Sequence, residues 1–118
     1  MQQILAIKKI SLFFAIMFFS IFFSITGLAA EYEIGQENKT FVMDGKKVES
    51  LKVKAGDSIR FRNKDPFFHN IFSLSPIKTF DLGSFPKGDS RTVTFDKAGK
   101  AEIECAIHPE MYMVIEVQ

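Results

Sequence analysis

The fold of this chain is indicated most clearly by the stretch Glu102-Ile103-Glu104-Cys105-Ala106-Ile107-His108-Pro109-Glu110-Met111-Tyr112-Met113-Val114-Ile115-Glu116-Val117. Its first residues alternate polar and apolar and place Ile103 and Cys105 on one face, which predicts a strand. The residues from Met111 to Val117 alternate in the same way and predict a second strand. Between these strands a thiol, an imidazole and a thioether fall within one short loop.

Further alternating segments precede this stretch, and turn signals such as Asp44-Gly45 and Ala55-Gly56-Asp57 separate them. The predicted strands cover residues 31–35, 40–43, 51–54, 58–62, 69–74, 91–95, 102–105 and 111–117. A short helical turn is an alternative for residues 77–80, where no strand is expected. Several short strands separated by turns predict an all-β sandwich or barrel.

The residues before position 30 predict a secretory signal peptide. Lys8 and Lys9 precede an apolar run rich in Phe over residues 10–25, and small residues follow it. Cleavage after Ala29 fits best, with cleavage after Ala30 as the alternative. We therefore expect a signal peptide over 1–29, a single domain over 30–118, and a periplasmic or secreted protein. An uncleaved membrane anchor stays open, although the apolar run is short for a spanning helix, which needs about 20 residues.

The charge of the expected domain is nearly balanced. The chain has 15 Lys and Arg against 14 Asp and Glu, and two of the basic residues, Lys8 and Lys9, lie in the expected signal peptide. Nucleic-acid binding, which needs a clustered basic surface, is therefore not expected. The chain contains a single cysteine, so no internal disulfide can form. A lone thiol in an oxidising compartment is a liability unless something occupies it, which points to a metal.

The candidate ligands are His69, Cys105, His108 and Met111. Electron-transfer copper sites take two His and one Cys, with a weak axial Met. Cys105, His108 and Met111 lie in the loop, and His69 is the only other histidine of the chain. Taken singly, a buried Cys or Met is usually core. Their coincidence with both histidines at strand ends favours copper, one ion per chain.

The sequence resembles the cupredoxins, in particular the short-loop members related to amicyanin, pseudoazurin and plastocyanin. The resemblance spans roughly residues 48–117 and is carried by His69-Asn70 and by Cys105-Ala106-Ile107-His108-Pro109-Glu110-Met111. It implies an eight-stranded Greek-key sandwich and one-electron transfer with redox partner proteins. Two positions depart from the pattern. Met113 stands where relatives often have Gly, and Ala106 where many have Ser or Thr, which removes one partner for the Asn70 side chain. Asn70 is still expected to tie the two ligand-bearing segments together.

The function expected from these residues is a blue-copper electron carrier and not an enzyme. We expect a monomer that meets its partners transiently through an apolar patch of Phe67, Phe68, Ile107 and Pro109, although Phe67 and Phe68 could equally belong to the core. No small-molecule substrate is expected. A copper-handling protein would use the same ligands and stays an alternative. A Cys105 hydrolase is disfavoured because no activating base or oxyanion hole is evident.

Overall fold

The computed structural model describes residues 27–118. The expected signal peptide lies almost entirely outside these residues, so its cleavage and the domain boundary at residue 29 or 30 stay predictions. Within the described part of the chain, no helix has the length and apolar character needed to cross a membrane.

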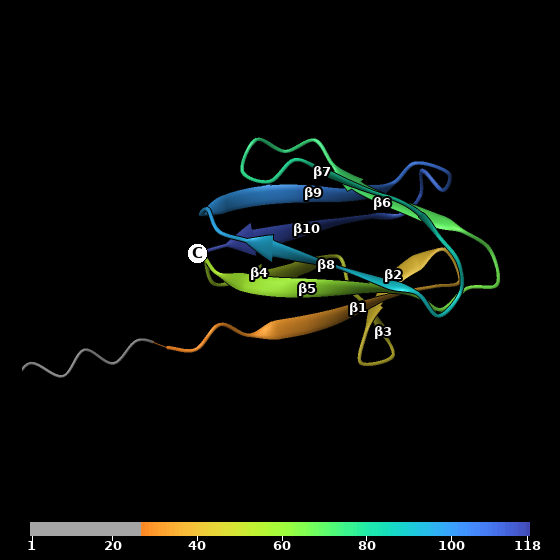
Figure 1. The fold of residues 1–118 in the computed structure, drawn as a ribbon, viewed down its shortest axis with the longest axis horizontal. Helices are drawn as coiled ribbons and strands as arrows, with labels where there is room; N and C mark the ends of the chain where they lie inside the picture. The colour runs from red at the N-terminus through yellow and green to blue at the C-terminus, as the bar shows by residue number, and fades with distance from the viewer. Residues whose placement is uncertain (1–26) are drawn as a thin grey trace, which may run out of the picture.

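In residues 27–118, ten strands form two five-stranded sheets that pack face to face (Figure 1). The strands are β1 (Glu31–Glu37), β2 (Thr40–Met43), β3 (Lys46–Lys47), β4 (Ser50–Val53), β5 (Asp57–Asn63), β6 (His69–Ser73), β7 (Phe80–Phe85), β8 (Ser90–Phe95), β9 (Gly99–Cys105) and β10 (Tyr112–Val117). One sheet has the order β3-β2-β1-β5-β8 and the other β4-β10-β9-β6-β7. The predicted all-β sandwich is confirmed, with ten strands instead of about eight.

The core lies between the sheets, and several of the longer strands bury alternate residues toward it. In β5 and β6 buried positions alternate with partly exposed ones along the whole strand, as expected when one face of a strand packs against another layer. The predicted inward face of β9 is confirmed by the burial of Ile103 and Cys105. Met111, Met113, Ile115 and Val117 are likewise buried on the inner side.

Two strands are not predicted by the sequence pattern. Residues 80–85 form β7 at the edge of a sheet, and the helical turn considered for residues 77–80 is wrong because Phe80 pairs with Ser73 of β6. Gly83 adopts a φ of 70° there, and the register with β6 shifts between Asn70 and Phe72. An exposed, irregular edge strand lacks the alternation that sequence patterns detect. The two-residue β3 is too short for any pattern.

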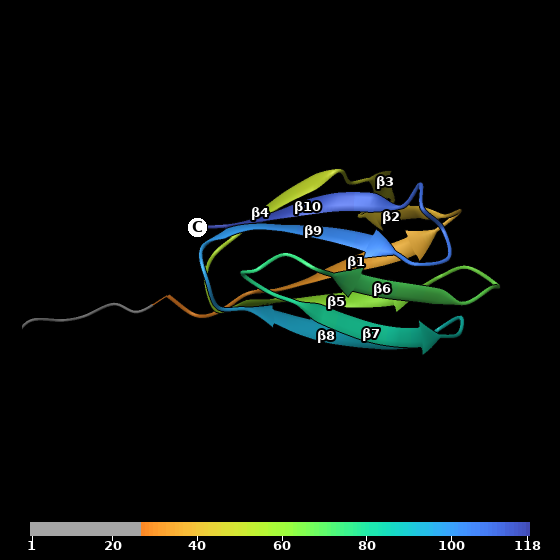
Figure 2. The same cartoon turned by 90° about the horizontal axis from the view of Figure 1, so that it is seen from above.

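The loops that hold the chemistry-bearing residues gather at one end of the sandwich. The loop after β9, the segment before β6 and the β1–β2 turn all lie at the end opposite the C-terminus (Figures 1 and 2). Seen from above, the strands of both sheets run along the long axis of the molecule (Figure 2). Loops from both sheets are therefore found at this end of the sandwich.

Candidate metal centre

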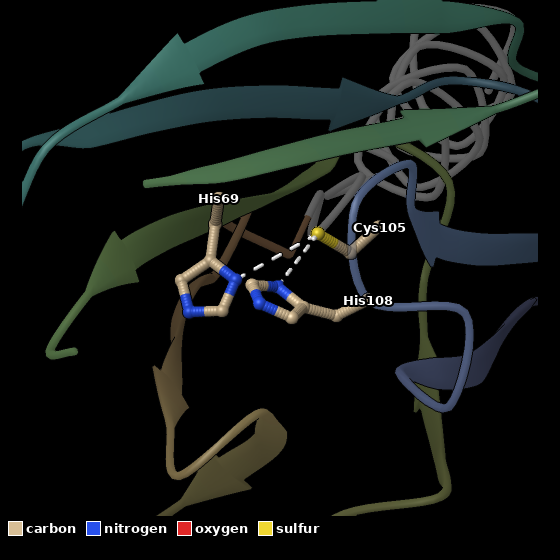
Figure 3. Close-up of side chains that lie close together, drawn as sticks. All are labelled: His69, Cys105 and His108. Atoms are coloured by element: carbon tan, nitrogen blue, oxygen red, sulfur yellow. Dashed lines mark hydrogen bonds between the residues drawn. The ribbon is translucent and has the colours of Figure 1, made fainter. Parts of the chain in front are cut away.

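Three of the four predicted ligands converge on one point. The Nδ1 atom of His69 lies 3.7 Å from Sγ of Cys105, and the Nδ1 atom of His108 lies 3.6 Å from the same sulfur. The ligand atoms of all three side chains lie within 4.8 Å of one another. Figure 3 shows both imidazoles turned toward the sulfur. Among the described residues, this is the group of His, Cys and carboxylate side chains arranged to hold a metal ion.

The pairing of β6 with β9 brings His69 and Cys105 together, although 36 positions separate them in sequence. Ile71 of β6 lies opposite Cys105 in the antiparallel register. The Asn70 N–H points to Cys105 Sγ at 3.5 Å, and the Asn70 carbonyl accepts the Ala106 N–H at 3.0 Å. These main-chain contacts hold the cysteine end of the loop against the strand that carries His69.

The loop itself is shaped by two short-range hydrogen bonds. The His108 N–H donates to the Cys105 carbonyl at 3.4 Å, and the Met111 N–H donates to the His108 carbonyl at 2.9 Å. Successive turns of this kind reverse the chain within a few residues and bring His108 back over Cys105. His108 is half-buried, whereas His69 is fully buried. The two histidines therefore differ in their access to solvent.

A buried carboxylate orients His69. Asp65 Oδ2 lies 2.7 Å from His69 Nε2, and Asp65 is only 3% exposed. The same carboxylate accepts the N–H groups of Asn38 and Lys39 at 2.6 Å and 3.1 Å. Because an ionised carboxylate only accepts hydrogen bonds, Nε2 of His69 must carry the proton. The lone pair of Nδ1 then faces Cys105, as in metal sites where a carboxylate fixes the tautomer of a ligating histidine.

The electrostatics of this pair favour a charged Asp65 and a neutral His69. Burial opposes ionisation of Asp65, but the hydrogen bonds from Lys39, His69 and Asn38 outweigh it and lower the pKa of the carboxyl. Burial lowers the pKa of His69, and the nearby Asp65 only partly offsets this. His69 is thereby kept in the neutral form that a metal ligand requires.

Asp65 is a functional residue that the sequence pattern does not single out. The segment from Asn63 to Pro66 predicts only a break between strands, since an Asp beside a Pro is typical of turns. The signal that points to Asp65 is its position four residues before the candidate ligand His69. A spacing of four residues brings the carboxylate to the imidazole only when the loop between them has the shape that the structure shows.

The structure places the predicted tie between Asn70 and the ligand loop in the main chain. The side-chain Oδ1 of Asn70 is buried and has no hydrogen-bond partner among the described residues. Ala106, which stands where relatives often have a hydroxyl, offers no donor from its side chain. The link between the two ligand-bearing segments is therefore made by two main-chain groups of Asn70: its carbonyl, which accepts the Ala106 N–H, and its N–H, which points to Cys105 Sγ.

Met111 is placed at the end of the loop, immediately before β10, and is 1% exposed. Met113 is also buried, but it lies inside β10 opposite Ile103 of β9. One residue pair, Tyr112 and Glu104, therefore separates Met113 from the loop end. Met111 is the methionine whose thioether belongs to the same loop as Cys105 and His108.

We expect Met111, and not Met113, to tune the metal. Because the axial ligand sets the redox potential of such sites, Met111→Gln should shift both the reduction potential and the visible spectrum of the copper-loaded protein. Met113→Leu is the matched control, because it changes a buried methionine of β10 to a residue of similar volume, and both properties should stay nearly unchanged. Voltammetry and absorption spectra of the two variants decide the matter, and the reverse pattern would refute the assignment.

The residues of the predicted apolar patch are exposed, and one of them, Phe67, lies beside His108. Phe67 is 36% exposed, Phe68 55% and Ile107 54%, and Pro109 is exposed as well. These side chains therefore do not belong to the core. The Phe67 ring lies 5.4 Å from the His69 ring and 5.2 Å from the His108 ring, measured between centroids. Phe67 therefore links the exposed apolar residues to both imidazoles.

Two imidazoles and one thiolate, with a methionine in the same loop, are the donor set of blue-copper sites. The hydrogen bond to His69 also fits a metal ligand, because Asp65 accepts the Nε2 proton and leaves Nδ1 of His69 free to bind the ion. A two-layer β-sandwich with this group under the loop at one end defines a cupredoxin-like protein.

Comparison with solved structures agrees with this class. An amicyanin variant in its Cu(I) state matches with a TM-score of 0.65 and 18% identity, covering 80% of this chain and 87% of that chain. An oxidised amicyanin variant matches with a TM-score of 0.65 and 20% identity over 75% and 82% of the two chains. A copper-containing nitrite reductase from Thermus scotoductus SA-01 matches with a TM-score of 0.64 and 21% identity, covering 80% of this chain but only 23% of that chain.

The resemblance lies in the fold and not in overall sequence. No protein-family model matches the sequence, and no curated protein sequence is significantly similar to it. At such low identity the structural matches establish that the chain has the cupredoxin fold. What the site binds and does has to be argued from its own residues.

Proposed function

We propose that the protein is an exported type 1 copper protein that carries single electrons between redox partners. The observation that carries the proposal is the convergence of His69 Nδ1 and His108 Nδ1 on Cys105 Sγ, at the end of a cupredoxin fold. His69, Cys105, His108 and Met111 would hold one copper ion. Copper bound there would supply one-electron redox chemistry between Cu(II) and Cu(I).

In this mechanism the protein would hold the ligands in fixed positions and would provide an apolar surface through which electrons leave the site. Asp65 and the main chain of Asn70 fix the segments that carry His69 and Cys105, so the ligands need not rearrange when the charge changes. His108 is half-buried beside Phe67, whereas the other three proposed ligands are buried, so electrons would pass to the surface through His108. The exposed patch of Phe67, Phe68, Ile107 and Pro109 suits a small, transient contact with a redox partner.

An absorption and electron-spin-resonance spectrum of the purified protein with one equivalent of Cu(II) tests the copper assignment. A strong visible band and reversible voltammetry would support an electron carrier. Fast transfer of copper to a chelator or to another protein, without reversible cycling, would favour the copper-handling alternative. A colourless Cu(II) complex would contradict both the ligand set and the function.

The cellular location and the absence of enzymatic activity are supported by different observations from those that support the copper site. Export to the periplasm or the outside of the cell rests on the signal-peptide pattern before residue 30. A non-enzymatic role rests on the ligand inventory, because both histidines of the chain are used by the proposed site and none is left for a catalytic metal. Size-exclusion chromatography of the copper-loaded protein tests the expected monomeric state.

The reduction potential should rise as pH falls. Protons compete with the metal for a histidine nitrogen. Cu(I) accepts fewer ligands than Cu(II), so protonation of His108 would stabilise the reduced state and raise the potential, by up to about 59 mV per pH unit for one proton and one electron. His69 is held by Asp65 and should stay bound.

Voltammetry of the copper-loaded protein from mildly acidic to mildly alkaline pH measures this dependence. The ring signals of His108 in the nuclear magnetic resonance spectrum of the reduced protein identify which histidine takes the proton. A flat potential with unmoved His108 signals would show that His108 stays bound throughout.

A further inference from the structure

Asn63 occupies an unusual place for an amide side chain. It is the last residue of β5 and is 0% exposed. It belongs to the sheet β3-β2-β1-β5-β8, whereas His69 and Cys105 belong to the opposite sheet. A buried amide is costly unless its donors and its acceptor are all paired. The partners of this amide therefore show what the residue does.

All three partners lie on segments next to the metal centre. The Oδ1 atom of Asn63 accepts the Asp65 N–H at 2.8 Å. The Nδ2 atom donates to the Phe67 carbonyl at 2.7 Å and to the Phe85 carbonyl at 3.0 Å. Both donor hydrogens of the amide and its carbonyl oxygen are thus used. In the main chain, the Asn63 N–H donates to the Asp89 carbonyl and the Asn63 carbonyl accepts the Gly88 N–H, both in the turn between β7 and β8.

Each of these partners in turn contacts or pairs with His69. Asp65 hydrogen-bonds His69 Nε2 at 2.7 Å. The Phe67 ring packs against the His69 ring at 5.4 Å. Phe85 lies opposite His69 in the register of β6 and β7. The hydrogen bonds of the Asn63 side chain all end on neighbours of His69 and not on a candidate ligand itself.

We propose that Asn63 is a positioning residue of the metal centre, which clamps the segment 64–68 so that Asp65 and Phe67 hold His69 in its ligating orientation. The role requires asparagine. Aspartate would lose both donors and place a second carboxylate beside Asp65, and serine has one hydroxyl donor in place of two N–H groups. The inference rests on the metal site of the proposed function but does not depend on electron transfer.

The test compares Asn63→Ala with Gln36→Ala. Gln36 is a matched control because it is a fully buried amide that lies opposite Asn63 on β1. Among the described residues its side chain donates to the Ile34 carbonyl of its own strand, and its Oε1 atom has no hydrogen-bond partner. Ring-nitrogen resonances of His69 are recorded in the metal-free proteins, and copper affinity is measured by competition with a chelator. The first readout tests the clamp without any metal.

In the unaltered metal-free protein we expect a single His69 tautomer with the proton on Nε2. Asn63→Ala should give mixed tautomers or exchange broadening and should weaken copper binding at least about tenfold, as is usual when a partner of a ligating histidine is lost. Gln36→Ala should lower thermal stability but leave His69 and the affinity unchanged. A folded Asn63→Ala protein with unaltered His69 signals and affinity, or equal effects of both substitutions, would overturn the proposal.

Should Asn63→Ala fail to fold, the unaltered chain provides the decision. Coupling between two events is reciprocal, so a clamp that favours ligation must itself be strengthened by ligation. Loading with Cu(I) should therefore slow hydrogen exchange of the Asn63 side-chain amide several-fold more than that of Gln36. Equal slowing at both amides would contradict a specific role of Asn63. The tautomer of His69 is measured in the metal-free protein and needs no redox activity. It therefore distinguishes a failure of the Asn63 proposal from a failure of the proposed electron-carrier function.

Discussion

Cys105→Ser is expected to abolish the intense visible band of the Cu(II)-loaded protein. The band in such sites arises from the bond between copper and a thiolate, and Cys105 is the only cysteine of the chain. The sulfur is also the atom on which both imidazoles converge, at 3.6 Å and 3.7 Å. A serine hydroxyl is a harder donor and cannot replace a soft thiolate for copper in either oxidation state.

The serine variant should keep the fold, because Ser is close in size to Cys at this 2% exposed position. Circular dichroism checks the fold, and absorption and spin-resonance spectra check the site. Ile103→Val serves as the control, since Ile103 is buried on the same face of β9 and lies outside the proposed ligand set. If the serine variant stays coloured, Cys105 is not the ligand and the proposed function fails.

Asp65→Ala is expected to weaken copper binding by about ten- to a hundredfold, the usual effect of losing the partner of a ligating histidine. It removes the acceptor for His69 Nε2 and for the N–H groups of Asn38 and Lys39. Because the substitution leaves the His69 Nε2–H and two main-chain N–H groups without their acceptor, it should also destabilise the metal-free protein by about 1–3 kcal/mol. Chelator competition and denaturant unfolding measure the two effects.

The pH dependence of the stability loss follows from the direction of the pKa shift. Burial acts to raise the pKa of Asp65 in the folded protein, but the hydrogen bonds that the carboxylate accepts lower it below the ordinary value of 3.8. The unfolded chain then takes up a proton before the folded one does, so the stabilisation is complete above about pH 4 and is lost as pH falls further. The stability difference between the unaltered protein and Asp65→Ala should narrow over the same range.

Asp57→Ala separates the two effects of the Asp65 substitution. Asp57 is another buried carboxylate that accepts main-chain N–H groups, from Ala30 and Lys54, but it lies at the start of β5, at the other end of that strand from Asn63. Its loss should destabilise the fold and leave copper affinity unchanged. If Asp57→Ala weakens copper binding as much as Asp65→Ala does, the effect is one of general stability and Asp65 has no special role at His69.

Much of the fold could be predicted because its signals are local. Alternation along residues 58–62, 91–95 and 111–117 reflects burial of one strand face, which is a property of neighbouring residues. The β7 strand escapes such prediction because it is an exposed edge with a register shift. Its existence depends on pairing with β6, which no pattern within residues 80–85 reveals.

The residue types along the chain define the inventory of the candidate site: one cysteine, two histidines, and a methionine that follows them in a short loop between strands. Donor chemistry depends only on residue type, so copper and the ligand candidates could be inferred without a structure. The difference between the two histidines, in contrast, arises from tertiary contacts. Pairing of β6 with β9 brings His69 to Cys105, and packing of the two sheets buries His69 against Asp65 while His108 stays half-exposed under the loop. Hydrogen bonds such as those of Asn63 and Asp65 join segments from both sheets, and such contacts exist only once the layers have packed.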